Sequence, residues 1–73
     1  MKGLTTGRIV HYTDYDGNQH RAAIVVHVEN ADEGVVHLHV FETGRLVRHA
    51  GIALNVAHSA TPKPDHWHWI EPA

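Results

Sequence analysis

The dominant pattern along the chain is an alternation of apolar and polar residues with a period of two, which is typical of β-strands. It predicts strands over residues 8–13, 20–29, 35–42, 45–50 and 66–70. Clusters of Asp, Asn and Gly predict turns over residues 14–18 and 30–34, and Thr43-Gly44 resembles a tight hairpin connection. The stretch 52–57 fits either a further strand or a short helical turn. Residues 58–65 form a loop, because two closely spaced prolines cannot join a ladder.

Short strands joined by tight turns in a chain of 73 residues predict a single domain, residues 1–73, with an all-β fold. A chain of this size hides only roughly 60% of its unfolded surface, so its core must be small. A closed barrel removes the exposed strand edges that such a small sheet protein cannot leave bare. We therefore expect a small, SH3-like, five-stranded antiparallel barrel, with an open sheet carrying one helix as the alternative.

The hairpin also predicts a register. A two-residue turn at Thr43-Gly44 places Leu38 opposite His49 and His39 opposite Arg48. The inner face of the third strand is then Val36, Leu38 and Val40. In the second strand one face, taken as the inner one, carries Ala22, Ile24, Val26 and Val28. Any register that keeps apolar residues together places His27 on the same face as His37 and His39. One outer face is therefore expected to display His27, His37, His39, Phe41, Leu46 and Arg48.

Composition narrows the function classes. A formal charge of −2 argues against a non-specific grip on nucleic-acid backbones, and the longest apolar run, residues 22–26, is too short for a membrane helix. The absence of cysteine excludes disulfides, thiolate metal sites and a cysteine nucleophile. The first residues lack the apolar region of an export signal, so we expect a cytoplasmic protein. Nine histidines make the charge sensitive to pH near neutrality.

Three sets of side chains are candidates for chemistry. The two His-x-His pairs, at 37/39 and 66/68, each place two imidazoles on one strand face, where they could hold a zinc or nickel ion with His27 as a third ligand. The favoured interpretation is that these histidines are polar residues of a solvated strand face. Trp67 and Trp69 also share a face and could stack on a nucleobase or fill the barrel. Arg8, Arg21, Arg45 and Arg48 are candidate anion contacts.

Catalysis has little support in the sequence. Ser59 is the only serine, and the carboxylate pairs 14/16 and 32/33 lie in turns where acidic residues need no catalytic reason. The phosphate-binding, dinucleotide-binding, hydrolase and zinc-protease motifs are all absent. We therefore expect a protein that is not an enzyme and needs no cofactor.

Four short blocks resemble a group of small, mostly hypothetical proteins of actinobacterial phages and prophages. These blocks are Gly7-Arg8-Ile9-Val10-His11-Tyr12, Arg21-Ala22-Ala23-Ile24-Val25, Val40-Phe41 and Trp67-His68-Trp69, and together they touch about half of the chain. The chain departs from the group at its end, where Ile70-Glu71-Pro72 replaces the usual Trp-Pro-Glu order. The resemblance implies a phage origin and an SH3-like barrel. By analogy with phage nucleotide sponges, it also implies a binding module rather than an enzyme.

Together these observations predict a module that sequesters a small, nucleotide-like anionic ligand. Because so small a barrel has little concavity, we expect the pocket to form between subunits of a homo-oligomer. One alternative is a protein-interaction module, such as a virion decoration protein or an inhibitor of a host protein; another is a histidine-metal domain. In the ligand-binding hypothesis the indoles stack on bases, a tyrosine forms a third wall, the arginines contact phosphate and a histidine donates a hydrogen bond: Trp67, Trp69, Tyr12, Arg8, Arg48 and His39.

Overall fold

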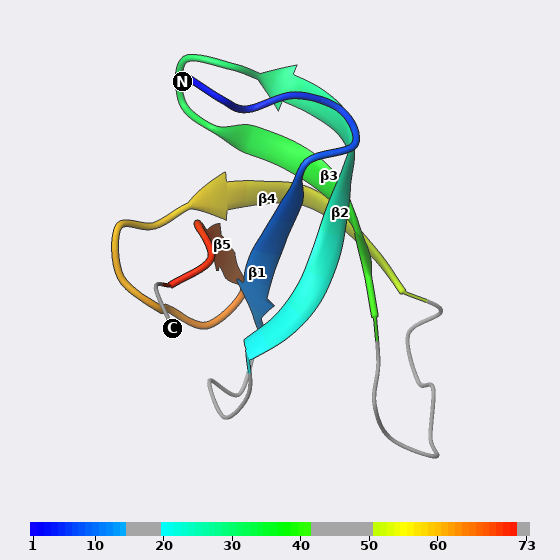
Figure 1. Ribbon diagram of the computed structural model, residues 1–73, viewed down its shortest axis with the longest axis vertical. Coiled ribbons are helices and arrows are strands. Elements are labelled where there is room, and N and C mark those ends of the chain that lie inside the picture. Colours follow the sequence, from blue (N-terminus) through cyan, green and yellow to red (C-terminus); the bar gives the residue numbers. More distant parts are fainter. Residues whose placement is uncertain (15–19, 42–50, 72–73) are drawn as a thin grey trace.

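The protein forms a closed barrel of five strands. The computed structural model describes residues 1–14, 20–41 and 51–71. The strands are β1 (Ile9–Thr13), β2 (His20–Asn30), β3 (Val35–Val40), β4 (Ile52–His58) and β5 (His66–His68), and they pair in sequence order until β5 closes against β1 (Figure 1). The described residues contain no helix. The all-β, five-stranded barrel prediction is therefore confirmed, and the open sheet with a helix is wrong.

One strand pair departs from the antiparallel arrangement that the sequence predicted. The strands β4 and β5 run parallel, with Ala57 opposite His66 and His58 opposite Trp67, whereas β5 is antiparallel to β1. The proline-containing loop 59–65 carries the chain back across the barrel before β5 begins, as Figure 1 shows. This crossover is what allows the last strand to close the barrel against the first.

The fourth strand lies later in the chain than the hairpin pattern predicted. The ambiguous stretch forms β4, which pairs with β3 through Leu38 opposite Ala53 and His39 opposite Ile52. The predicted partners of those two residues, His49 and Arg48, are therefore wrong. They lie outside the described residues, as do the Thr43-Gly44 turn, the predicted strand 45–50 and Leu46. The register prediction failed because it assumed that the return strand follows the turn directly.

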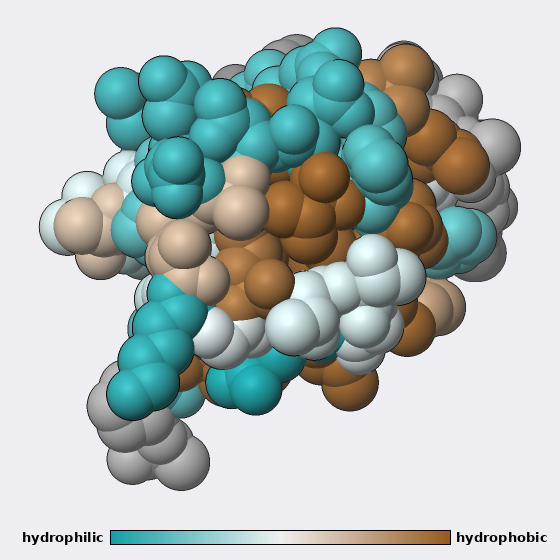
Figure 2. Space-filling model, turned by 90° about the horizontal axis from the view of Figure 1, so that it is seen from above, coloured by the Kyte–Doolittle hydropathy of each residue, from teal (hydrophilic) through white to brown (hydrophobic). Residues whose placement is uncertain are grey.

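The core is a small cluster of aliphatic side chains with one indole. As predicted, β3 contributes Val36, Leu38 and Val40, which are 6% exposed or less. The N-terminal segment covers one end of the barrel, where its α-amino group donates a hydrogen bond to the Ala31 carbonyl at 2.7 Å. Seen from above, this end shows an apolar area bordered by hydrophilic side chains (Figure 2). The buried hydrophobic residues are Leu4, Val10, Ala23, Val25, Val36, Leu38, Val40, Val56 and Trp67.

A β-bulge in β2 corrects the predicted inner face of that strand. The ladder pairs Val25 with Leu38 and then His27 with His37, so Val26 is an extra residue. Such an insertion reverses which alternate positions face the core. Ala23 and Val25 are fully buried before it, whereas Val26 is 46% exposed. The expectation that Ala22, Ile24 and Val26 face inward is therefore wrong, although His27 does lie opposite His37.

The part of the chain that the structure describes holds no helix with the length and apolar content needed to cross a membrane.

Candidate metal centre

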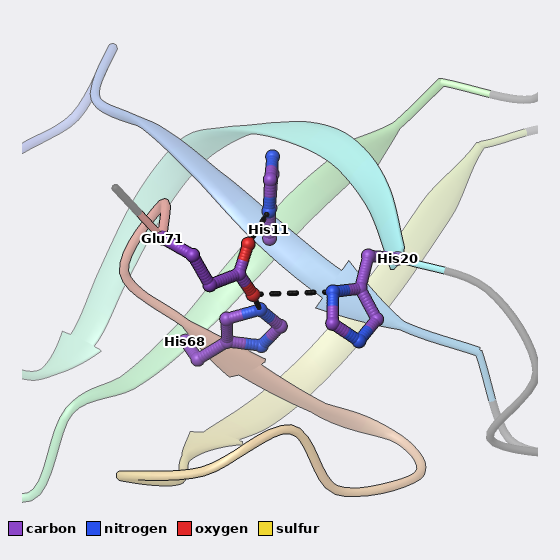
Figure 3. A group of neighbouring side chains, drawn as sticks. All are labelled: His11, His20, His68 and Glu71. Carbon is purple, nitrogen blue, oxygen red and sulfur yellow. Dashed lines mark hydrogen bonds and ion pairs between the residues drawn. The ribbon is translucent and has the colours of Figure 1, made fainter. Parts of the chain in front are cut away.

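Three histidines and one glutamate gather where β1 lies between β2 and β5. His11 lies directly opposite His68 in the β1–β5 pair, and His20 begins β2 opposite Thr13, two residues beyond His11. Opposite residues in an antiparallel pair project to the same side, and diagonal neighbours are still within reach of long side chains. Glu71 follows β5 and turns its carboxylate back between the three imidazoles (Figure 3). We call these four residues the histidine site.

The carboxylate of Glu71 contacts all three rings. Its Oε2 lies 2.9 Å from Nδ1 of His11, and its Oε1 lies 3.1 Å from Nδ1 of His20 and is hydrogen-bonded to Nε2 of His68. The closest ring centroids, those of His20 and His68, are 4.8 Å apart. Each residue therefore presents one donor atom to a common centre, and all four donor atoms lie within 4.8 Å of one another.

The histidine site is buried on one side and open on the other. The His68 side chain is only 5% exposed, whereas those of His20 and Glu71 are 39% and 40% exposed. Partial desolvation alone would raise the pKa of Glu71. The hydrogen bonds from its own backbone N–H and from His11 and His68, together with the charge of His68, outweigh that effect and lower the pKa to about 2. Glu71 is therefore an anion throughout the neutral range.

This donor set matches the needs of a divalent transition metal. Imidazole nitrogen and carboxylate oxygen both bind Zn²⁺ at about 2.0–2.2 Å, and a tetrahedral site with such bonds places its ligand atoms about 3.3 Å apart. The four donor atoms lie within 4.8 Å of one another, so their spacing exceeds that of a zinc site by about 1.5 Å at most. The backbone pairing of β1 with β2 and β5 holds the three histidines in place for this contraction.

The tautomers set the cost of coordination at each histidine. When Nδ1 of His11 or His20 binds a metal, the ring proton moves to Nε2, which water can reach in these partly exposed side chains. For His68 the remaining nitrogen is Nδ1, which is buried and lacks a hydrogen-bond partner among the described residues. A proton left there without an acceptor costs about 1–3 kcal/mol. His68 is thus the histidine whose coordination costs most.

A second cluster, His27, Glu29 and His37, is less suited to a metal. The two imidazoles stack with centroids 5.3 Å apart, and Glu29 Oε2 lies 3.0 Å from His27 Nε2 and 3.5 Å from His37 Nε2. However, the backbone N–H of Asn55 donates to His37 Nδ1 at 3.0 Å. A neutral imidazole that accepts at Nδ1 carries its proton at Nε2, which is the atom facing Glu29. The contacts of this cluster are therefore those of a hydrogen-bonded group of side chains rather than those of a metal site.

The predicted histidine sets are only partly assembled. His27 and His37 do meet, but His39 does not join them; its ring lies against Phe41, with centroids 5.2 Å apart. From the 66/68 pair, only His68 belongs to the histidine site. His66 instead has its Nδ1 2.8 Å from the Pro64 carbonyl oxygen.

Two predicted ligand-binding residues contact the core of the barrel. Trp67 is fully buried, and its Nε1–H donates to the Gly34 carbonyl at 2.7 Å. This corrects the expectation that its indole stacks on a ligand, because no face of a core side chain is open to one. Tyr12 packs against the core, and its hydroxyl donates to Asp65 Oδ1 at 2.5 Å.

Among the described residues, Arg8 and the two indoles are the predicted ligand-binding residues whose ring and charge contacts bring them together. The guanidinium carbon of Arg8 lies 5.3 Å from the centroid of the Trp69 ring, which meets Trp67 edge-on. His39 is on β3, separated from β1 by β2, and Arg48 lies outside the described residues. The described residues therefore do not assemble a single site from all six.

Sequence reasoning missed His11, His20 and Glu71. His11 and His68 are far apart in the chain and meet only because β5 closes the barrel against β1. The expectation of a closed barrel could have identified the contact between His11 and His68. Closure pairs the first strand with the last, and it thereby places His11 beside the second His-x-His pair. Glu71 carried no such signal, because it follows the last strand.

Comparison of the chain with models of protein families, with curated proteins and with solved structures found no match. The functional argument therefore rests on the geometry of the histidine site, and the phage origin implied by the sequence blocks stays a prediction.

Proposed function

We propose that this barrel is a metal-binding domain that holds one divalent transition-metal ion at the histidine site. The observation that carries the proposal is the convergence of four donor atoms, from three strands and the segment after β5, within 4.8 Å. A histidine-metal domain is one of the alternative functions expected from the sequence, and this proposal adopts that alternative with a different set of ligands. Three neutral imidazoles and one carboxylate give the bound ion a coordination sphere with a net charge of +1.

The donor types define the class of metal. Imidazole suits Zn²⁺, Cu²⁺, Ni²⁺ and iron, whereas Mg²⁺ and Ca²⁺ prefer sites made of oxygen atoms alone. The ligands come from β1, β2 and the region of β5, which has only three residues. A bound ion would therefore join the β5 region to β1 and β2. Because it binds the folded chain, it would also stabilise the barrel by mass action.

Calorimetric titration of Zn²⁺ into untagged, chelator-treated protein tests the proposal. We expect one equivalent to bind at pH 7.5. The variant His20→Gln should weaken binding at least about tenfold, because even outer partners of a metal site contribute about 10–100-fold to affinity. His20 begins β2 and is exposed, so its replacement leaves the core intact.

The matched control is His39→Gln, which removes another exposed strand histidine outside the histidine site. It should bind Zn²⁺ as the wild type does. Equal losses in the two variants, or no binding by the wild type, would show that Glu71 and the histidines form only an ion-pair network that closes the barrel.

A second candidate function, binding of a nucleotide-like anion, is favoured by the Arg8–Trp69 contact. A guanidinium held over an indole, in a side chain that is exposed, leaves its N–H donors available to a phosphate. Among the described residues, the contact of this guanidinium is the one with the Trp69 ring. In this proposal the phosphate contacts Arg8 and the base contacts the part of the Trp69 ring that is exposed to solvent.

Titration with adenosine monophosphate and a cyclic dinucleotide, followed by tryptophan fluorescence, tests this second candidate. Arg8→Gln should abolish a response that Lys63→Gln, a change at an exposed loop cation, leaves intact. Native mass spectrometry of the same samples tests the expected homo-oligomer. A wild-type protein that responds to neither nucleotide would refute the candidate.

A further inference from the structure

The four ligands of the histidine site are not held equally. His11, His20 and His68 are residues of β1, β2 and β5, and their backbones are fixed by strand pairing. Glu71 lies three residues beyond the end of β5, in a segment without strand pairing, and its side chain is 40% exposed. Three ligands thus lie on paired strands, and the fourth lies in the segment that follows β5.

The present position of the Glu71 carboxylate shows what the centre accommodates. Its two oxygens lie between three imidazoles, one oxygen on His11 and the other on His20 and His68 (Figure 3). A planar oxyanion with two oxygens therefore fits among these rings. The exposed sides of His20 and Glu71 leave a route from solvent to the same position.

We propose that Glu71 is a displaceable ligand and that a small external oxyanion, a carboxylate or a phosphate monoester, takes its place on the metal. This inference rests on the proposed function, because it concerns the fourth position of the same metal. The barrel would then present a metal on three histidines and use Glu71 to occupy the open position until an anion replaces it. Such an open position is what separates exchangeable from purely structural metal sites.

The structure also predicts how strongly Glu71 competes. A group tethered by a short segment has an effective concentration in the millimolar range, so an external carboxylate must exceed that range to displace it. Removing the tethered carboxylate should lower the concentration of external anion needed for half-occupancy by about tenfold or more. The three histidines remain, so the metal should still bind.

The experiment uses Co²⁺, whose visible absorption reports the coordination sphere, bound to the full chain. Acetate and methyl phosphate are titrated separately, and sodium perchlorate at equal ionic strength serves as the non-coordinating control. The variants are Glu71→Ala and Glu33→Ala, the latter an exposed glutamate of the β2–β3 turn that lies outside the histidine site.

We expect acetate and methyl phosphate each to change the Co²⁺ spectrum, with a midpoint about tenfold lower in Glu71→Ala than in the wild type or Glu33→Ala. A response to only one of the two identifies which class of oxyanion the position accepts. Spectra that respond to neither anion in any variant would overturn the inference while leaving metal binding intact. Loss of Co²⁺ binding in Glu71→Ala would also overturn it, because Glu71 would then be an obligatory ligand. Failure of the wild type to bind Co²⁺ would instead refute the proposed function.

Discussion

Replacing Trp67 with phenylalanine tests whether this indole belongs to the core or to a ligand site. The side chain is fully buried and donates to the Gly34 carbonyl at 2.7 Å. Phenylalanine keeps an aromatic ring but leaves that buried carbonyl without its partner, at a cost of about 1–3 kcal/mol, before any cavity cost is added. A domain of this size has a free energy of unfolding of about 4–11 kcal/mol, so the loss is a large fraction of the total.

Urea denaturation followed by far-ultraviolet circular dichroism measures this loss, and thermal unfolding should show a fall in Tm of about 5–20 °C. The matched control is Trp69→Phe, since Trp69 is only half-buried and packs at the margin of the core. It should cost clearly less than Trp67→Phe. The assignment of Trp67 to the core is wrong if the free energy of unfolding of Trp67→Phe is within about 0.5 kcal/mol of the wild-type value while the variant no longer binds a ligand that the wild type binds.

Three further predictions concern the barrel itself. Burial, together with the charge of neighbouring His68, lowers the pKa of His58 below its ordinary 6.5. The unfolded chain therefore binds more protons than the folded one, and the free energy of unfolding falls as the pH drops from 6.5 towards the folded pKa. Denaturation at pH 7.5 and at pH 5.5 should show that His58→Gln loses less stability between the two pH values than the wild type does, and equal losses would contradict this. Gly34→Ala should destabilise more than Gly7→Ala, since both glycines have positive φ but only at Gly34 would a Cβ lie 2.9 Å from another Cβ. Val25→Thr should cost about 1–3 kcal/mol by burying a hydroxyl, whereas Val26→Thr, at the exposed bulge, should change the free energy of unfolding by less than about 0.5 kcal/mol; equal costs would place the bulge elsewhere.

The period-two pattern predicted the fold class because alternation along each strand is a local constraint, and because a small sheet protein must in general cover its strand edges. The inner face of β3 followed directly from Val36, Leu38 and Val40. The inner face of β2 did not follow, because a bulge at Val26 changes the phase of the alternation without leaving a mark in the composition. The choice of β4 depended on where the chain returns to pair with Leu38, which no turn motif specifies.

The histidine site was beyond the reach of sequence patterns for a related reason. His37 and His39 were conspicuous because they are close in sequence, yet His39 belongs to neither histidine cluster of the described residues. His11 and His68 meet through barrel closure, and Glu71 joins them from outside the strands. Trp67 could have had either function, and only its hydrogen bond to the Gly34 carbonyl and its burial decide for the core.

The most direct test of the metal site is nitrogen-15 NMR of the histidine side chains, recorded with and without one equivalent of Zn²⁺. The nitrogen-15 chemical shift of an imidazole nitrogen that binds a metal differs from that of a nitrogen that carries a proton. The spectrum therefore identifies the ligand atoms. The geometry predicts coordination through Nδ1 of His11, Nδ1 of His20 and Nε2 of His68, with the rings of His27 and His37 unaffected. Shifts confined to other histidines, or none at all, would contradict the metal site proposed for this barrel.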